Sequence, residues 1–416
     1  MKKRNMTYNP PIDPTSLRCL YSRTLNAAEQ TDDKAPNRIL LTGHSHQAQP
    51  DVADEAARYA TSLAHKFVDD KWGVIFGEVL PEFQKGIAKR IGCADPNSII
   101  NGHNTHELVS PFLSSWHWDH ETRIVSTSSE FQSLLRQLLA LQGQRDVDVE
   151  FVSTEDKDSL TDRIVKAITP GTNAVLVSTV FFNDGFVLQD VPRIVEKASS
   201  VGASVLLDAA HMCNVRMMNV DRDYGDAFVT GTGYKYAQGG EGAAWLRVPK
   251  STRLIPTITG WFADFPALKE EKYPVPIRYN EGAAKFAGAT FDATGLCRQN
   301  AAFKLMDERG LTVELLERNN LYQTKYLMDV FEEFGLRKYN CEVVSSPLDA
   351  RRGPFLAIDI GTAERAGKVQ SMLKNDYAIW TDNRGKILRL GPAPYTLQEE
   401  LDWGMRYLSE TLKKTP

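Results

Sequence analysis

The chain has 416 residues, of which 42% are hydrophobic and 25% are charged, so it is long enough to bury a large core and to form two domains. Its formal net charge of −4 at pH 7 gives no sign of an electrostatic surface for nucleic acid. Nucleic acid is therefore not expected as a partner.

The cysteines and the apolar segments indicate the compartment. The five cysteines lie far apart without a Cys-x-x-Cys pair, which argues against a disulfide framework or a zinc module. No apolar segment long enough for a signal peptide follows the basic start, and none long enough to span a membrane occurs elsewhere. We therefore expect a cytoplasmic protein with reduced thiols and no membrane contact.

The first 49 residues are predicted to form an N-terminal arm, because residues 1–37 are polar and interrupted by prolines. Residues 51–92 then place apolar side chains at helical spacing. This second pattern predicts two helices joined by a link that contains glycine.

From residue 98 the pattern changes to short β-branched runs that alternate with helical stretches. Continuous apolar runs separated by helices are typical of parallel strands that are buried on both faces of a sheet. Residues 50–297 are therefore predicted to form a large α/β domain with a mostly parallel, doubly wound sheet. The expected strands are 98–101, 123–127, 149–153, 174–179, 204–208 and 227–230.

A long helical pattern begins at residue 298 and leads away from this sheet. Strands are expected at 354–360 and 386–392, and a closing helix at 397–414. Residues 298–416 are therefore predicted to form a smaller α+β domain.

Two neighbouring strand ends carry side chains that suggest chemistry. Asp208 follows a run of apolar residues, where a carboxylate is partly desolvated and needs a cation or a strong donor. The next strand ends in Gly231 and Gly233, which let the backbone approach a ligand before Tyr234 and Lys235. Separately, these features are typical of a helix cap and a surface lysine. Together they predict a ligand that needs an anion on one side and an amine on the other.

Pyridoxal phosphate (PLP) meets that requirement, because its aldehyde forms a Schiff base with a lysine and its ring nitrogen pairs with a carboxylate. The segment LLDAAHMCNV…TGTGYKYAQGGEGAAWL resembles the class V, fold type I PLP enzymes, most closely the kynureninase branch. A Rossmann nucleotide site fits less well, because Gly231 and Gly233 are not followed by the third glycine of that fingerprint, and the chain has no P-loop. The resemblance covers most of the chain and implies the fold type I architecture.

The resemblance implies catalytic roles for four residues of this segment. Lys235 would carry the cofactor and then act as general base, with a pKa lowered by cationic neighbours and burial. Asp208 would pair with the ring nitrogen of the cofactor, and His211 would contact the phenolate oxygen of the ring or the far side of that carboxylate. Tyr234 would hold the phosphate and relay a proton.

A phosphate site is expected where NGHNTHELV (101–109) follows a strand and opens a helix. Backbone N–H groups at Asn104 and Thr105 can bind a phosphate dianion there, although an ordinary helix cap would look the same. The resemblance places the phosphate cup of the family at this point. It also places Trp261 of the TGWFADFP loop near the phosphate.

Further cofactor contacts are implied only by the resemblance. Phe131 would cover the cofactor ring, with Ser133 as a nearby polar contact, although a phenylalanine is otherwise more often part of a core. Ser178 would contribute from a strand end. Thr290 lies in a loop that reaches the site of a neighbouring subunit, so the resemblance implies a homodimer with shared active sites.

The substrate end needs a clamp for the carboxylate of an α-amino acid. The segment KILRLGPAPYT resembles the small-domain segment of the family whose arginine binds that carboxylate, which implies this role for Arg389, with Arg384 as a second candidate. His46 and His65 are expected to line the substrate pocket. The loop at 43–46 and Thr290 both differ from the kynureninase pattern.

The predicted function is a kynureninase-like hydrolytic or eliminating cleavage at the β-carbon of an α-amino acid. An aminotransferase, an epimerase or a C–S lyase of the same class would share the cofactor site. A cysteine desulfurase fits less well, because residues 376–389 contain no cysteine. A non-catalytic PLP-binding protein is the alternative of a different class. No histidine pair has the spacing of a metal site, so no metal is expected.

Overall fold

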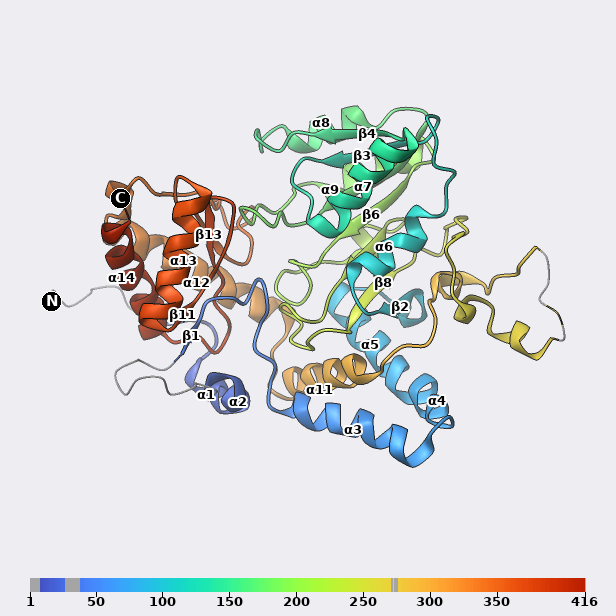
Figure 1. The fold of residues 1–416 in the computed structure, drawn as a ribbon, viewed down its shortest axis with the longest axis horizontal. Helices are drawn as coiled ribbons and strands as arrows, with labels where there is room; N and C mark the ends of the chain where they lie inside the picture. Colours follow the sequence, from blue (N-terminus) through green and yellow to red (C-terminus); the bar gives the residue numbers. More distant parts are fainter. Residues whose placement is uncertain (1–7, 27–37, 271, 273–275, 416) are drawn as a thin grey trace.

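The computed structural model describes residues 8–26, 38–270, 272 and 276–415, so parts of the predicted arm (1–7 and 27–37) lie outside the described residues. A seven-stranded sheet in the order β2-β8-β7-β6-β5-β3-β4 forms the centre of the large domain (Figure 1). Its strands are β2 Ile99–Gly102, β3 Arg123–Thr127, β4 Asp148–Val152, β5 Thr172–Ser178, β6 Ser204–Asp208, β7 Phe228–Gly231 and β8 Ala244–Arg247. The six expected strands are thus present. The seventh, β8, is an addition.

The strand β8 is the one antiparallel member of this sheet. It pairs antiparallel with both β7 and β2, whereas β4, β3, β5, β6 and β7 pair in parallel. Because β2 and β7 each pair antiparallel with β8, β2 points in the same direction as β7. The carboxyl ends of β2, β7, β6, β5 and β3 therefore lie along one edge of the sheet, where open α/β sheets bind ligands.

Helices cover both faces of the sheet, and each face has its own apolar core. Val205 and Leu207 of β6 join one core cluster, whereas Leu206 and Phe228 join the other. Side chains of a strand alternate between faces, so both sets of residues are buried, as the continuous apolar runs predict. The helices of this domain are α3 Val52–Phe67, α4 Lys71–Val74, α5 Leu80–Ile91, α6 Thr105–Leu113, α7 Gln132–Arg145, α8 Leu160–Ala167, α9 Val191–Ser200 and α10 Val220–Asp223.

The C-terminal part packs a second sheet against long helices. Its antiparallel order is β12-β13-β10-β9. The elements are α12 Val313–Glu333, β9 Glu342–Val343, β10 Leu356–Asp359, α13 Ala363–Tyr377, β11 Ile379–Trp380, β12 Asp382–Arg384, β13 Ile387–Leu390 and α14 Gln398–Lys414. The preceding helix, α11 Thr294–Glu308, packs instead on α3 and α5 of the large domain. The chain is thus a mixed α/β protein with a large, mostly parallel sheet and a smaller α+β part, as expected.

The N-terminal segment is more ordered than its polar sequence suggests. Two short helices, α1 Thr15–Arg18 and α2 Ser22–Leu25, flank a single turn of 3₁₀ helix. The Tyr21 ring is buried in the core of the large sheet, and its hydroxyl donates to Gln238 Oε1 at 2.6 Å. The strand β1 Ile39–Leu40 pairs in parallel with β11. These contacts are tertiary, which is why the local pattern indicated an irregular arm.

The remaining short helices include the 3₁₀ segments Pro96–Ser98, Trp261–Lys269, Gly282–Phe286 and Leu336–Tyr339, and the π-turn Ile75–Val79. Figure 1 shows the segment around Trp261–Lys269 (yellow) projecting away from the body of the large domain. None of the helices within the described ranges has the length and apolar character needed to cross a bilayer.

Candidate active site

The candidate site lies at the carboxyl edge of the large sheet, where three central strands end side by side. Ser178 at the end of β5 is paired in register with Asp208 at the end of β6, and Asp208 is paired with Thr230 of β7. Lys235 follows β7 after a glycine-rich turn, and its Nζ lies 3.4 Å from Nδ1 of His211. The fold therefore brings together the acid, the imidazole and the amine that the sequence motif predicts.

Lys235 is a buried lysine with 5% of its surface exposed. Burial lowers the pKa of its amine from 10.5 to about 8; the charge of Asp208 opposes this shift, and the charges of Arg389 and Arg384 add to it. Its Nζ lies 5.5 Å from the centre of the Phe131 ring. A fraction of the amine is therefore neutral near neutral pH, as nucleophilic attack on an aldehyde requires.

Asp208 and His211 are buried on either side of this amine. Burial raises the pKa of Asp208, which the charge of Lys235 opposes, and Asp208 Oδ1 accepts a hydrogen bond from the Ala210 N–H at 2.9 Å. Burial, with the charge of Lys235, lowers the pKa of His211 well below 6.5. His211 is therefore a neutral imidazole at pH 7, and the charged form of Asp208 is stabilised when a cation meets it.

The sequence analysis did not single out Glu130, which is buried behind Ser178. The Ser178 hydroxyl donates to Glu130 Oε2 at 2.5 Å, and the Ser178 N–H and the Thr127 hydroxyl donate to Oε1 at 3.2 and 2.6 Å. Burial raises the pKa of Glu130 to about 7, and the charge of Asp208 adds to the shift. The Ser178 hydroxyl therefore donates its hydrogen to Glu130 and not to a ligand. The acidic residue directly before Phe131 was the signal available in the sequence.

Arg389 lies in a buried ion network that the sequence did not reveal. Its Nε donates to Asp382 Oδ1 at 2.8 Å, its Nη2 donates to Asp382 Oδ2, and its Nη1 donates to the Phe182 carbonyl at 2.5 Å. The Nε2 of His44 lies 2.7 Å from Asp382 Oδ1. His44 stands in the loop whose departure from the kynureninase pattern was noted, but neither His44 nor Asp382 was named as a site residue.

The charges of this network are strongly coupled. Burial lowers the pKa of His44 to about 4, which the charge of Asp382 opposes. Burial alone would raise the pKa of Asp382, but His44 and Arg389 hold it below its usual value. Asp382 is therefore an anion that fixes the position of the Arg389 guanidinium.

The helix α6 begins at the expected phosphate site. Asn104 is its N-cap, and its side-chain oxygen accepts the Glu107 N–H at 2.9 Å. Thr105 is the first residue of the helix, so its N–H is among those without an intrahelical partner. A carboxylate oxygen of Glu107 accepts the His103 N–H at 2.9 Å. The helix start offers backbone donors to an anion, as predicted.

Several predicted residues lie outside this cluster. His46 stacks on the Tyr234 ring with centroids 4.9 Å apart, so these two line one wall. The side chain of His65 on α3 is exposed, and so is that of Thr290. Trp261 packs on Phe262 and Phe265 in the projecting segment. Ser133 lies in the first turn of α7, where its carbonyl accepts from Gln137.

Cysteines do not contribute a reactive thiol to this cluster. All five are free, and four of them are buried; the fifth, Cys19, is exposed on the N-terminal segment. Burial raises the pKa of Cys213 to about 12 and that of Cys297 to about 11. Thiols with such pKa values are poor nucleophiles. Within the described part of the chain, no group of three or more His, Cys, Asp or Glu residues could hold a metal ion.

Residues 45–374 match the family model described as Aminotransferase class-V. No curated protein matches the sequence.

Solved structures with the same fold include several enzymes of sulfur chemistry. The cysteine desulfurase from Thermococcus onnurineus NA1 (apo form) has a TM-score of 0.76 at 17% identity and covers 98% of this chain and 99% of its own. The cysteine desulfurase CsdA from Escherichia coli has a TM-score of 0.76 at 15% identity, with 99% and 100% covered. The cystine C–S lyase C-DES, in complex with its product cysteine persulfide, has a TM-score of 0.74 at 16% identity, with 90% and 98% covered.

Proposed function

The chain belongs to the class V aminotransferases, a family of PLP-dependent enzymes, and on this premise we propose that it is a lyase that cleaves a bond at the β-carbon of an α-amino acid, with a carbon–sulfur bond as the preferred target. The observation that carries the proposal is the buried Lys235 amine at the carboxyl edge of the sheet, 3.4 Å from His211 and within the electrostatic influence of Asp208. The names of the structural neighbours support sulfur as the leaving atom.

The residues at this edge fit PLP. Asp208 is a buried carboxylate that lacks a directly bonded cation among the described residues, and a protonated ring nitrogen would supply one. The Phe131 ring centre lies 5.5 Å from the Lys235 amine, and the start of α6 offers N–H donors to a phosphate. When bound, PLP supplies an electron sink for the negative charge that develops at the substrate α-carbon.

Lys235 and its neighbours handle the proton. A neutral Lys235 amine can accept the α-proton, and its lowered pKa makes the neutral form available near pH 8. His211, 3.4 Å away, is neutral and can hold the amine in position through its ring nitrogen.

Arg389 can still bind the substrate carboxylate. Three of the five N–H donors of its guanidinium are used by Asp382 and the Phe182 carbonyl, so two remain on Nη1 and Nη2. Asp382 holds the guanidinium from one side, which leaves its far end for a second carboxylate. This arrangement selects α-amino acids in one orientation.

The positions of the cysteines distinguish the proposed lyase from a cysteine desulfurase. A desulfurase uses a mobile cysteine ahead of its arginine, but residues 376–389 contain none, and the cysteines outside that segment are buried or lie on the N-terminal segment. Without a thiol to accept sulfur, the leaving group must depart as a thiol, and the carbon skeleton is released as pyruvate and ammonia after addition of water. An aminotransferase or an epimerase remains a rival that product analysis separates.

Kynureninase-like hydrolysis receives less support from the described geometry. An aryl ketone would need a stacking wall or donors from His46, His65, Trp261 and Thr290. Of these, His46 lies beside Tyr234, whereas the side chains of His65 and Thr290 are exposed. A wall built from all four would require residues from a second copy.

Product analysis tests the proposal. The holoenzyme is incubated separately with S-alkyl cysteines, cysteine and kynurenine, and pyruvate, alanine and anthranilate are measured. We expect pyruvate with a thiol from the S-alkyl cysteines. Alanine with transferred sulfur would contradict the proposal in favour of a desulfurase, and rapid release of alanine and anthranilate at micromolar kynurenine would contradict it in favour of a kynureninase.

We further propose that the enzyme is a homodimer in the cytoplasm with shared active sites. The projecting segment exposes large apolar side chains on the protomer, including Ile255 at 54%, Ile258 at 55% and Phe265 at 46%. Exposed apolar groups gathered in one segment are typical of an interaction surface. Thr290, in the same region, would then reach the partner's phosphate site.

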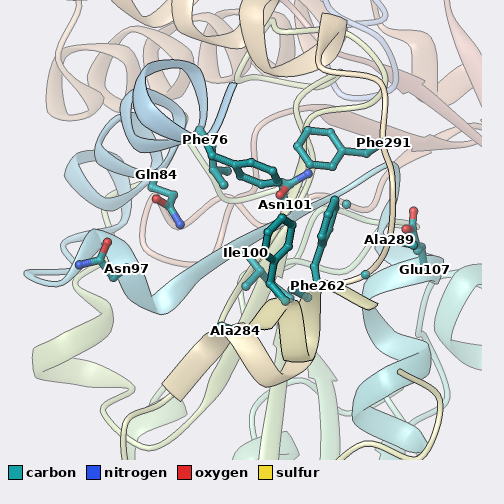
Figure 2. Close-up of a pocket in the computed structure, with 15 residues that line it drawn as sticks. Phe76, Gln84, Asn97, Ile100, Asn101, Glu107, Phe262, Ala284, Ala289 and Phe291 are labelled. Atoms are coloured by element: carbon teal, nitrogen blue, oxygen red, sulfur yellow. The ribbon is translucent and has the colours of Figure 1, made fainter. Parts of the chain in front are cut away.

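A cavity of about 420 Å³ supports this interface. Figure 2 shows Phe76, Phe262 and Phe291 around it, beside Asn101 at the end of β2. Glu107 of α6 also lines it, so the cavity adjoins the start of the helix at the predicted phosphate site. A loop from a second copy that entered here would reach that helix start.

A further inference from the structure

A second cavity, of about 590 Å³, opens beside the active site. Its wall includes Asp382, which binds Arg389, and His46, which stacks on Tyr234 next to Lys235. The cavity therefore adjoins the residues that hold Arg389 and cover Tyr234. The volume of this cavity is large enough to hold part of a ligand.

The carboxylates on this wall already have partners. Asp54 pairs with Arg23, and Asp51 accepts hydrogen bonds from the Ser22 hydroxyl at 2.5 Å and from the N–H groups of Ser22 and Arg23 at 3.1 and 3.0 Å. Asp382 is held by Arg389 and His44. The carboxylates of this wall are thus already paired with cations or hydrogen-bond donors of the protein.

Two arginines on the same wall form no ion pair with a carboxylate among the residues that the structure describes, although the charge of Arg298 contributes to lowering the pKa of Asp292. Arg38 lies with its guanidinium 4.8 Å from the centre of the Trp380 ring and donates weakly to the Thr24 carbonyl at 3.4 Å. Arg298 of α11 donates to the Glu241 carbonyl at 2.7 Å. The Nε of each is buried without an acceptor. Buried guanidinium donors without acceptors are stabilised by an anion with matching geometry.

We propose that this cavity binds a carboxylate at the far end of the substrate's β-substituent, through Arg38 and Arg298. The inference rests on the proposed function, because it names the class of substrate: an α-amino acid whose β-substituent ends in an acid. Arg389 holds the α-carboxylate, and the two cavity arginines hold the second one. A guanidinium bonds to a planar carboxylate through two parallel N–H groups, which gives direction as well as charge.

A matched pair of substrates tests this proposal with the holoenzyme. S-(2-carboxyethyl)-L-cysteine and S-(2-carbamoylethyl)-L-cysteine have nearly the same shape and differ in the charge of the terminal group. We expect the acid to have a kcat/KM for pyruvate release about ten-fold above that of the amide, the scale of a charge-assisted hydrogen bond. Arg38→Gln or Arg298→Gln should reduce this preference to less than about three-fold, because the kcat/KM of the acid should fall more than that of the amide.

The control variant is Arg23→Gln, which removes a guanidinium from the same wall that is already paired with Asp54. It should keep the preference for the acid. Equal loss in Arg23→Gln and Arg38→Gln would assign the effect to the general field of the wall and overturn the proposed contact. Equal turnover of acid and amide by the unmutated enzyme would also overturn it, while the lyase function would stand.

A second measurement separates this proposal from the proposed function. The dissociation constant of each compound is obtained from the change in cofactor absorbance, which needs no bond cleavage. If pyruvate is not released but the acid binds about ten-fold more tightly and Arg38→Gln removes the difference, the cavity assignment holds and the lyase assignment fails. If both compounds bind equally, the cavity assignment fails whichever reaction the enzyme catalyses.

Discussion

At the scale of single residues, burial is the main cause of the chemistry of this site. Lys235, Asp208 and His211 are all buried, and burial is the largest influence on the pKa of each. Burial disfavours the charged form of every group. The amine and the imidazole therefore lose their protons more easily, and the carboxylate is stabilised when a cation binds beside it. The same three residues on a protein surface would have their ordinary pKa values and little reactivity.

The first prediction at this scale concerns Lys235→Ala. The unmutated holoenzyme should be yellow, and borohydride should fix the cofactor covalently to the peptide that contains Lys235. The alanine variant should not be labelled, because the nitrogen that forms the bond is absent. Mass spectrometry of the reduced, digested protein checks this, with Lys250→Ala, an exposed lysine, as the control that stays labelled. A labelled peptide in the Lys235→Ala protein would contradict the central assignment.

The second prediction concerns the pH dependence contributed by Glu130. Burial raises its pKa from 4.5 to about 7 in the folded protein. The folded state therefore holds this proton more tightly, so the stability contribution is fully present below about pH 4.5 and is lost as the pH rises through about 7. Glu130→Gln cannot titrate. Between pH 5 and pH 8 the free energy of unfolding of the unmutated protein should fall by about 2 kcal/mol more than that of the Glu130→Gln variant.

Denaturant unfolding of the cofactor-free proteins at several pH values measures this difference. The exposed Glu121 provides a matched control, because Glu121→Gln should follow the curve of the unmutated protein. Parallel curves for Glu130→Gln and the unmutated protein would show that the Glu130 carboxyl titrates at an ordinary pKa.

At the scale of elements, the site depends on where strands and helices end. The register of β5, β6 and β7 sets Ser178, Asp208 and Thr230 side by side, and the antiparallel β8 lets β2 point in the same direction as β7. The start of α6 therefore lies at the same edge as Lys235. A change of one residue in the register of β6 would turn Asp208 to the other face of the sheet.

The prediction at this scale concerns the start of α6. Asn104→Ala removes the acceptor of the Glu107 N–H, so the free energy of unfolding should fall by about 1 kcal/mol, whereas Asn104→Ser should retain most of it. If this helix start also binds the phosphate, the alanine variant should bind PLP more weakly than the serine variant. Urea unfolding and PLP titration measure the two effects. Equal stability of both variants would show that the cap contributes little.

At the scale of the whole molecule, the projecting segment is the part that the proposed homodimer would cover. Its exposed apolar side chains and the adjoining cavity are features that water does not stabilise. Closed twofold symmetry would cover both in each protomer at once. The same contact would bring Thr290 toward a partner's site, which is where the family resemblance implies that it lies.

The prediction at this scale concerns Phe265→Asp. Sedimentation velocity should show the unmutated protein as a dimer. The dimer of the variant should dissociate at protein concentrations more than ten-fold above those at which the unmutated dimer dissociates, because a buried carboxylate without a partner is costly. Leu139→Asp places the same charge at an exposed apolar position on α7 and should leave the dimer intact. A monomer with full PLP affinity would contradict the shared site.

The local sequence determined the large sheet and the chemistry of its edge. Apolar runs between helices predicted six strands of the large sheet, because strands buried on both faces need apolar side chains at every position. The motif around Asp208 and Lys235 predicted a class V PLP enzyme of fold type I, and the family match confirms that family. The kynureninase-like specificity was not confirmed, since the structural neighbours are desulfurases and a C–S lyase.

The tertiary structure alone decided which distant side chains meet. His44, Asp382 and Arg389 form one network although 338 positions separate His44 from Asp382, and Glu130 bonds to Ser178 across 48 positions. The strand β8 and the order of the N-terminal segment also depend on packing partners far away in the chain. Local periodicity reports which face of an element is buried. It carries no information on which other element covers that face, so charge networks and cavities arise only when the chain has folded.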